Sequence, residues 1–456
     1  MIRFAYTVAL WLLLPWVVLH LLWRGRRQPE YLKHWGERFG FHSRRPQAPT
    51  IWLHAVSVGE TRAAQPLVAA IRRRYPDHRI LLTHMTPTGR QTSEELFGLA
   101  SDGIERIYLP YDYPFAVRRF LDHYRPQLGL IMETELWPNL IAACRARSVP
   151  LALVNARLSA RSARRYARFP ALTRGALGGL AAIAAQNTTD AERLRVLGAP
   201  RVEVFGNVKF DIDPPATQLE LARAFRARSG ERPVCLAAST REGEETLLLD
   251  AWMEKVGTPG VPPAGRAGEA TALQGGRARN ALLAVADGGT ANSALLVIVP
   301  RHPQRFGEVA ALIESRGLRL QRRSDGEAVA PDTQVWLGDS MGEMFAYYAS
   351  ADVAFIGGSL LDFGSQNLIE ACAVGTPVLL GPSTYNFAGA AQDAIACGAA
   401  QQLGTAEEIV VAASRLLADA AQRRAMRDAG LAFAARHRGA TQRTMALVEQ
   451  LIRAGR

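Results

Sequence analysis

The sequence predicts an α/β protein in which two doubly wound, parallel-sheet domains follow an amino-terminal membrane anchor. Three observations support this prediction. The chain has 456 residues, more than a single hydrophobic core usually organises. Two successive series of short apolar runs alternate with amphipathic helical stretches, a pattern typical of parallel sheets. The first twenty or so residues are almost wholly apolar.

Residues 1–27 are the expected anchor. The apolar run 4–23 matches the roughly 20 residues that a helix needs to cross the hydrocarbon core. Three arginines follow it directly, and by the positive-inside rule they place the body of the protein on the cytoplasmic side. No small-residue cleavage site follows, so a removed signal peptide is not expected. A proline and a histidine interrupt the run, which leaves an in-plane anchor as the alternative.

The first domain is expected to span residues 28–213. Its first strand starts at Ile51, and the later apolar runs are 80–85, 104–109, 128–132, 151–155, 180–185 and 202–206. Residues 214–232 are expected to form a linker. The second domain, 233–456, has apolar runs at 234–239, 294–299, 334–337, 353–356 and 378–381. Two such halves in one chain are expected to face each other across a ligand-binding cleft.

Two further segments have expected roles. Residues 255–292 are rich in Gly, Ala and Pro without a period, which predicts a flexible insertion. The last helix, about 406–453, is long enough to cross back to the first domain.

Composition restricts the partners. The net charge of +12 favours an acidic partner. The chain lacks an aromatic RNA-binding motif and a helix-turn-helix signature, so anionic lipid is favoured over nucleic acid. None of the four cysteines forms a C-x-x-C pair, and the nine histidines show no metal-ligand spacing. We therefore expect no disulfide framework, no metal and no cofactor.

Glu60 is the most informative position. The strand from Ile51 runs into a tight turn at Gly59 and delivers Glu60 to the start of a helix. Ligands of open α/β sheets bind beyond the carboxyl ends of the strands, where a carboxylate can serve chemistry. The simpler alternative is that Glu60 only caps the first turn of its helix.

Other strand ends of the first domain also carry charged residues. Glu133 and Glu135 follow the strand 128–132, where they are either solubilising acids or functional groups. The basic run 155–166 is either a solvated helix face or a dock for phosphates. Lys209 follows a strand and could neutralise a leaving phosphate.

The second domain has polar loops after several strands. Arg301 lies in a proline-flanked turn, and the loop 338–343 could wrap a base or ribose. The Gly-rich segment 357–364 precedes a helix that we expect to open near Ser365, with free backbone amides that favour an anion. Asn367 and Glu370 are three residues apart and share a helical face, from which Glu370 could bind a ribose.

Taken together, these motifs resemble the 3-deoxy-D-manno-octulosonic acid (Kdo) transferases, which are GT-B glycosyltransferases of lipopolysaccharide synthesis. The resemblance covers nearly the whole chain. It rests on Trp-Gly-Glu-Arg-Phe-Gly (35–40), Ser-Val-Gly-Glu (57–60), Met-Thr-Pro-Thr-Gly (85–89), Glu-Thr-Glu-Leu-Trp-Pro-Asn (133–139), Asn-Ala-Arg-Leu-Ser-Ala-Arg-Ser (155–162), Lys-Phe-Asp (209–211), Pro-Arg-His-Pro (300–303) and Gly-Asp-Ser-Met-Gly-Glu (338–343). One motif departs: the family's Gly-Gly-His-Asn-Pro-Leu-Glu reads Gly-Ser-Gln-Asn-Leu-Ile-Glu at 364–370.

The resemblance implies a GT-B enzyme that moves Kdo from CMP-Kdo to an anionic lipid A precursor, lipid IVA, with inversion, at the cytoplasmic face of the inner membrane. It implies Glu60 as the general base, with Lys209 and Glu133 stabilising the transition state. The implied CMP-binding residues are Pro300, Arg301, Met341, Gly342, Glu343, Asn367, Leu368, Ile369 and Glu370. Two alternatives are a membrane-associated transferase that uses a UDP-sugar and a non-catalytic lipid-binding scaffold.

Overall fold

A computed structural model of the chain describes residues 2–42, 48–98, 103–256 and 294–455. It divides into two compact units, one formed by Met1–Ile212 with His437–Arg456 and the other by Asp213–Arg436. The expected insertion, 255–292, lies outside the described residues except for its first two positions.

The first unit is built on a seven-stranded parallel sheet with the order β3-β2-β1-β4-β5-β6-β7. The strands are β1 (Thr50–His54), β2 (Arg79–His84), β3 (Ile104–Tyr108), β4 (Leu128–Met132), β5 (Leu151–Ala156), β6 (Ala182–Ala185) and β7 (Glu203–Val204). Strands β1, β4 and β5 are buried along their whole length, which explains their nearly continuous apolar sequence. The predicted doubly wound sheet is confirmed.

Helices accompany the strands of this sheet. They are α2 (Val58–Ala63), α3 (Gln65–Arg74), α4 (Pro87–Phe97), α5 (Pro114–Tyr124), α6 (Pro138–Ala146), α7 (Ala160–Ala167), α8 (Pro170–Leu177) and α9 (Thr188–Val196). Short 3-10 turns, η1 (Pro29–Tyr31), η2 (Trp35–Phe39) and η4 (Val208–Asp211), complete this part of the unit. Side chains from opposite faces of β1 belong to two separate apolar clusters, one with Trp52 and the other with Leu53.

Helix α1 (Ile2–Arg27) is the first element of this unit. Among the described residues it is the single helix long and apolar enough to cross a membrane. Its first turns contact the folded unit, because the hydroxyl of Tyr6 donates to Asp112 at 3.0 Å. The hydroxyl of Tyr113 donates to the carbonyl of Leu10 at 2.9 Å, and the Trp11 and Tyr113 rings lie 5.5 Å apart.

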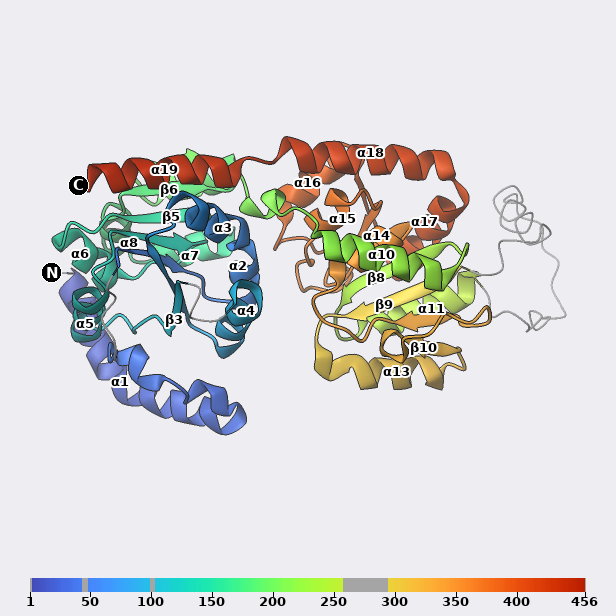
Figure 1. Ribbon diagram of the computed structural model, residues 1–456, viewed down its shortest axis with the longest axis horizontal. Helices are drawn as coiled ribbons and strands as arrows, with labels where there is room; N and C mark the ends of the chain where they lie inside the picture. Colours follow the sequence, from blue (N-terminus) through green and yellow to red (C-terminus); the bar gives the residue numbers. More distant parts are fainter. Residues whose placement is uncertain (1, 43–47, 99–102, 257–293, 456) are drawn as a thin grey trace. The chain divides into compact units, whose positions relative to one another are not determined.

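The expected long last helix is instead three helices. These are α17 (Ala406–Ala418), α18 (Ala420–Arg436) and α19 (Ala440–Ala454). Only α19 belongs to the first unit, where it packs against α3 and η4 (red in Figure 1). Asp211 fixes its start by accepting hydrogen bonds from the backbone amides of Gly439 and Thr441 at 2.6 and 2.5 Å. This carboxylate satisfies amides that would otherwise be unpaired at a helix start.

The second unit has its own seven-stranded parallel sheet, ordered β10-β11-β9-β8-β12-β13-β14. The strands are β8 (Val234–Thr240), β9 (Leu295–Pro300), β10 (Leu320–Arg322), β11 (Val335–Leu337), β12 (Val353–Ile356), β13 (Val378–Leu380) and β14 (Ala400–Gln402). Its other helices are α10 (Ala216–Ser229), α11 (Glu244–Val256), α13 (Phe306–Ser315), α14 (Met344–Ser350), α15 (Ile369–Ala373) and α16 (Ala388–Ala396). The 3-10 turns η5 (Pro303–Arg305) and η6 (Arg323–Asp325) lie between β9 and β11.

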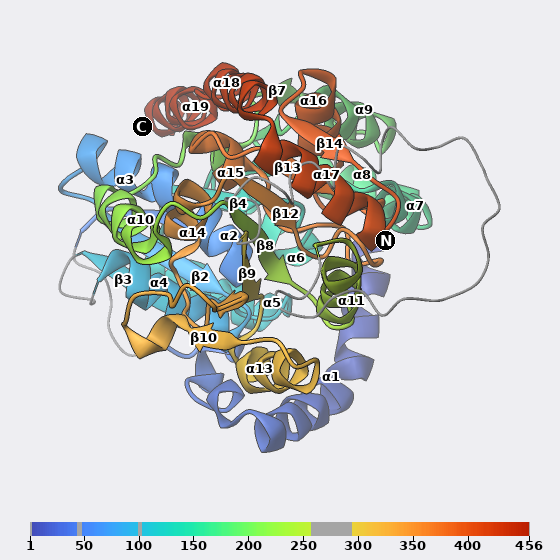
Figure 2. The same cartoon turned by 90° about the vertical axis from the view of Figure 1, so that its right-hand side faces the viewer.

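Two features of this unit differ from the sequence prediction. Most of the expected linker 214–232 is helix α10, which lies beside α14 in the same unit (Figure 2). Its Phe225 is fully buried, with its ring 5.1 Å from that of Trp336, so α10 contributes to the core of the unit. The edge strands β10 and β14 were not predicted, because their sequences, Leu-Gln-Arg and Ala-Gln-Gln, are largely polar and only partly buried.

Candidate functional site

The order of the first sheet points to its functional edge. The chain builds β1, β2 and β3 toward one side and β4 to β7 toward the other, so the order reverses between β1 and β4. Ligands of doubly wound sheets bind at this reversal, beyond the carboxyl ends of the strands. His54 ends β1, and Met132 ends β4. The segments that follow these residues carry Glu60 and Glu133, so the sequence-predicted carboxylates lie at this edge.

Glu60 lies in the first turn of α2, where two groups hold its carboxylate. The hydroxyl of Ser57 donates to Oε1 at 3.0 Å, and the backbone N–H of Val56 donates to Oε2 at 2.8 Å. In return, the Ser57 hydroxyl oxygen accepts from the N–H of Glu60 at 3.5 Å and caps the helix. The alternative that Glu60 only caps the first turn of its helix therefore describes part of the geometry, since Glu60 does stabilise the start of α2.

Capping does not account for the electrostatic environment of Glu60. The pKa of its carboxyl group is raised to about 8, mainly by burial, with contributions from the nearby Glu133 and, to a smaller extent, Glu135. The hydrogen bonds from Val56 and Ser57 act in the opposite direction. An exposed cap would stay ionised at neutral pH, whereas this carboxyl exchanges its proton near neutral pH. That property is expected of a general base.

Glu133 and Lys209 are brought together near Glu60. Glu133 leaves β4 with φ +56°, and its N–H donates to the carbonyl of Val154 in β5 at 3.0 Å. The Nζ atom of Lys209 lies 4.0 Å from Oε1 of Glu133. Lys209 belongs to η4, whose preceding residue, Asn207, accepts a hydrogen bond from the Lys209 N–H at 3.0 Å. Loops from three separate parts of the chain thus place two carboxylates and one ammonium group at a single edge.

Sequence reasoning missed His54, which completes this group. The residue lies in the apolar strand β1 and is fully buried. Its Nε2 atom lies 4.0 Å from Oε2 of Glu135. The pKa of Glu135 is raised to about 7, mainly by burial; Trp137 lowers it, and the charge of Glu133 raises it. A histidine in an apolar strand is usually a core residue. The available signal was its position as the last residue of β1, directly before the functional loop.

The basic run 155–166 lies largely on α7, a helix with no buried residue. Arg161, Arg164 and Arg165 are exposed on it. This exposure fits both alternatives drawn from the sequence, a solvated helix face and a dock for phosphates.

The sequence-predicted donor residues of the second unit lie at the carboxyl ends of its strands. Pro300 ends β9, and the N–H of Arg301 donates to the carbonyl of Thr240 at the end of β8, at 3.0 Å. Glu343 follows the exposed Met341 and Gly342, and its carboxylate is paired with Arg323 at 2.9 and 3.0 Å. Arg323 was not predicted, because it comes from η6 rather than from a motif.

The segment 367–370 presents its residues unequally. The amide of Asn367 donates to Oε1 of Glu370 at 2.9 Å, and its oxygen accepts from the N–H of Ile369 at 3.1 Å. Leu368 and Ile369 are almost fully buried, so a ligand could meet only their backbone. Asn367 and Glu370 are partly exposed and are the two side chains of this segment open to a ligand.

The Gly-rich loop differs from its prediction in two respects. Helix α15 begins at Ile369 rather than near Ser365. The loop amides are also not free, because the buried carboxylate of Glu244 accepts from the N–H groups of Gly358 at 2.7 Å and Leu360 at 3.0 Å. The N–H of Ser365 bonds instead to the carbonyl of Gly358. A buried carboxylate thus satisfies two loop amides upstream of the predicted helix start, and the Ser365 amide is paired within the loop.

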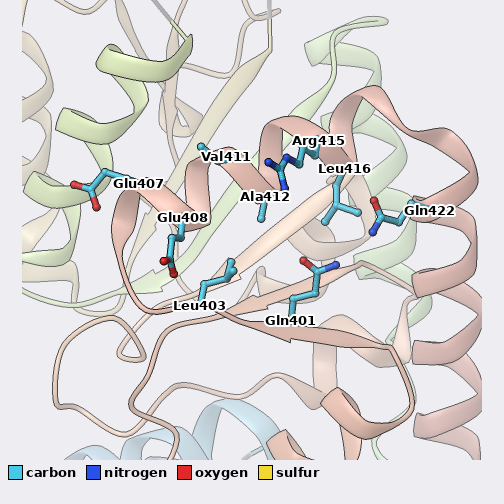
Figure 3. A pocket seen from close by; sticks show the side chains of 9 residues that line it. All are labelled: Gln401, Leu403, Glu407, Glu408, Val411, Ala412, Arg415, Leu416 and Gln422. Carbon is cyan, nitrogen blue, oxygen red and sulfur yellow. The ribbon is translucent and has the colours of Figure 1, made fainter. Parts of the chain in front are cut away.

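Two pockets lie away from these residues. One, of about 520 Å³, is formed by β14 and the neighbouring helices of the second unit (Figure 3). Its lining combines apolar side chains with Glu407, Glu408 and Arg415, and includes no predicted donor residue. The other, of about 700 Å³, lies between the start of α1 and helices α6 and α8. Among the described residues, no group of three or more His, Cys, Asp or Glu could hold a metal ion.

Comparison with known proteins identifies relatives. A family model described as 3-deoxy-D-manno-octulosonic-acid transferase (kdotransferase) matches residues 33–212. The 3-deoxy-D-manno-octulosonic acid transferase of Bordetella pertussis is 44% identical over 454 residues, which cover 98% of this chain and 99% of the relative. That of Haemophilus influenzae is 34% identical over 453 residues and 98% of both chains. A glycosyltransferase structure from Rickettsia africae, 12% identical, matches the fold with a TM-score of 0.56 over 89% of this chain and 99% of that one.

Proposed function

The chain belongs to the 3-deoxy-D-manno-octulosonic acid (Kdo) transferase family, and we propose that Glu60 is the general base of its transfer reaction. It is a glycosyltransferase that transfers Kdo in lipopolysaccharide synthesis. One observation carries the proposal for Glu60: its carboxyl group lies at the order reversal of the first sheet, and burial raises its pKa to about 8. The alternative of a non-catalytic scaffold gives no reason for such a group at this edge.

The proposed donor is CMP-Kdo, and the proposed acceptor is the sugar hydroxyl of a lipid A precursor such as lipid IVA. Glu60 takes the proton of this hydroxyl while its oxygen attacks the anomeric carbon of Kdo. The bond from that carbon to the phosphate oxygen breaks, and CMP leaves with the electron pair. Attack opposite the leaving group inverts the anomeric centre. General base catalysis of this kind contributes roughly 10²–10⁴-fold to the rate.

Lys209 and Glu133 are proposed to stabilise the transition state. The Lys209 ammonium group, 4.0 Å from Glu133, supplies positive charge beside the reacting groups. Glu133 in turn fixes Lys209 and, as a negative charge, keeps the pKa of Glu60 high. Lys209→Met is therefore expected to lower kcat more than it changes the KM for either substrate.

CMP is proposed to bind at the strand ends of the second unit. The contributing residues would be Pro300, Arg301, Met341, Gly342, Glu343, Asn367, Leu368, Ile369 and Glu370. Arg301 supplies positive charge after β9, while Asn367 and Glu370 offer polar groups to a ribose or base. Arg301→Ala is expected to raise the KM for CMP-Kdo with a smaller effect on the KM for the lipid acceptor.

The membrane arrangement is proposed to be in-plane, at the cytoplasmic face of the inner membrane. The first turns of α1 are held by the folded unit through Tyr6 and Leu10. The remaining segment, 12–27, extends about 24 Å at 1.5 Å per residue, less than the roughly 30 Å of a hydrocarbon core. A cysteine introduced at Ile2 should therefore not react with a membrane-impermeant thiol reagent in intact cells. Labelling from outside would show that the helix spans the membrane.

Transfer assays with defined substrates test the proposed reaction. The enzyme should transfer Kdo from CMP-Kdo to lipid IVA, and CMP should protect it from proteolysis better than UDP does. Glu60→Ala should lose nearly all transfer. Full activity of that variant, or protection by UDP alone, would contradict the proposed base or the proposed donor, respectively.

A further inference from the structure

His54 has one ring nitrogen whose role is settled by its neighbours. The residue is fully buried at the end of β1, and its Nδ1 atom lies 3.0 Å from the backbone carbonyl oxygen of Thr83 and 2.8 Å from its Oγ1 atom. A carbonyl oxygen can only accept, so Nδ1 must carry the proton. The Oγ1 atom of Thr83 also accepts from the indole N–H of Trp52 at 2.8 Å. Thr83 therefore fixes the ring in one tautomer.

The other nitrogen of His54 has no partner at hydrogen-bond distance. Burial lowers the pKa of His54 to about 3, so the ring is neutral and Nε2 is a bare acceptor. Nε2 is buried and forms no hydrogen bond, and Oε2 of Glu135 lies 4.0 Å away. Leaving a buried acceptor unpaired costs free energy, which favours the approach of a donor. An ionised carboxylate cannot donate, whereas a protonated one can.

The surroundings of Glu135 and His54 contain more negative than positive groups. The titratable groups that face the pair are Glu60 from α2, Glu133 from the loop after β4, His84 from β2, Tyr166 from α7 and, through Glu133, Lys209 from η4. His84 is neutral because burial lowers its pKa to about 4. Within the part of the chain that the structure describes, three carboxyl groups therefore face one ammonium group, and each carboxylate opposes the ionisation of its neighbours.

We propose that Glu135 stores a proton by donating its O–H to Nε2 of His54, so that no negative charge on Glu135 opposes the ionisation of Glu60. His54 is then a positioning residue, which acts on the reaction only through Glu135. The hydrogen bond forms when the partly exposed Glu135 side chain rotates to bring Oε2 to about 2.7–3.0 Å from Nε2. This inference rests on the proposed role of Glu60.

The proposal predicts the sign of a pH effect. Without the acceptor at position 54, Glu135 loses the bond that favours its protonated form and ionises. A second negative charge beside Glu60 then raises the pKa of the base. In His54→Leu, the rising limb of kcat/KM against pH should move up by about one unit, so activity at pH 7 falls roughly tenfold and recovers at high pH. His54→Gln, which keeps an acceptor, should restore most of the original profile.

Glu135→Gln provides the decisive comparison. A glutamine amide is neutral and can donate to Nε2, so it imitates the protonated glutamic acid. This variant should keep the original profile, and the double variant His54→Leu/Glu135→Gln should return the rising limb to its original position. A purely structural role for His54 would not be rescued by a change at Glu135.

His84→Leu is the matched control. His84 is as buried as His54, but its two ring nitrogens bond to the carbonyl of Ala55 at 2.8 Å and to Ser93 Oγ at 3.1 Å. Its loss should lower the melting temperature without moving the pH profile. An unshifted profile in His54→Leu, or an inactive Glu135→Gln, would overturn the inference. If His54→Leu does not fold, the pH profiles of Glu135→Gln and His54→Gln still test the inference. An active Glu60→Gln would instead remove the proposed base, whatever the result at position 54.

Discussion

Substitutions of Ser57 and Glu60 should separate the two roles of the Glu60 carboxyl group, which are to stabilise the start of α2 and to act as the proposed general base. Glu60→Gln keeps an oxygen that can accept from the N–H of Val56, and glutamine also fits this position of a capping box. At pH 5, where the Glu60 carboxyl group of the folded protein is protonated, its effect on stability should therefore stay below about 1 kcal/mol. Transfer needs a group that takes a proton, so kcat/KM should fall by roughly 10²–10⁴. At about 1.4 kcal/mol for each factor of ten, this equals roughly 3–5 kcal/mol of barrier.

Ser57→Ala should show the opposite pattern. It removes the hydroxyl that caps α2 and donates to Glu60, which should cost about 1 kcal/mol and lower the melting temperature by about 2–4 °C. The carboxyl group remains, so activity should stay within about tenfold, with a small upward move of the pH profile. The assay is Kdo transfer beside thermal unfolding for both variants. The reasoning fails if Glu60→Gln stays within tenfold of the original activity, or if its loss only follows unfolding.

Three further predictions concern stability. Glu244→Ala should lower the free energy of unfolding by about 3–5 kcal/mol in denaturant titrations, because several loop amides lose their buried acceptor; a cost below 1 kcal/mol would contradict this. Ser365→Gly should raise it by about 0.5–1 kcal/mol, since Ser365 adopts φ +70°, which favours glycine; a loss of stability would show that its hydroxyl matters more than its backbone. Burial raises the folded-state pKa of Glu60 to about 8, above its unfolded value. The protonated carboxyl group should therefore contribute stability that is fully present below about pH 4.5 and is lost as the pH rises toward 8. The melting temperature of the original protein relative to Glu60→Gln should therefore fall from pH 5 to pH 8, and a constant difference would argue against the raised pKa.

The sequence predicted the sheets well because most of their strands are buried on both faces. Runs such as 128–132 and 353–356 are continuously apolar and bounded by polar loops, so their type and limits were clear. Glu60 and Glu133 were predicted because each follows such a run directly. The carboxyl ends of parallel strands meet at one edge, so topology alone brings these residues together.

The remaining features depend on contacts that have no local pattern. Glu244 lies more than a hundred residues before the loop whose amides it satisfies, so no local pattern predicts this internal acceptor. His54 was passed over because a histidine inside an apolar strand is usually part of the core. The segment 214–232 was predicted as a linker, whereas most of it is helix α10, whose Phe225 is buried in the core of the second unit.

The dependence of kcat/KM on pH tests the role of Glu60 most directly. With CMP-Kdo and lipid IVA, kcat/KM should rise about tenfold for each pH unit below the pKa of the base and level off near pH 8. In Glu60→Gln this rising limb should disappear, and the residual rate should be low and nearly independent of pH over the same range. A rising limb of unchanged position in Glu60→Gln would assign the proton transfer to another group and contradict the proposed mechanism.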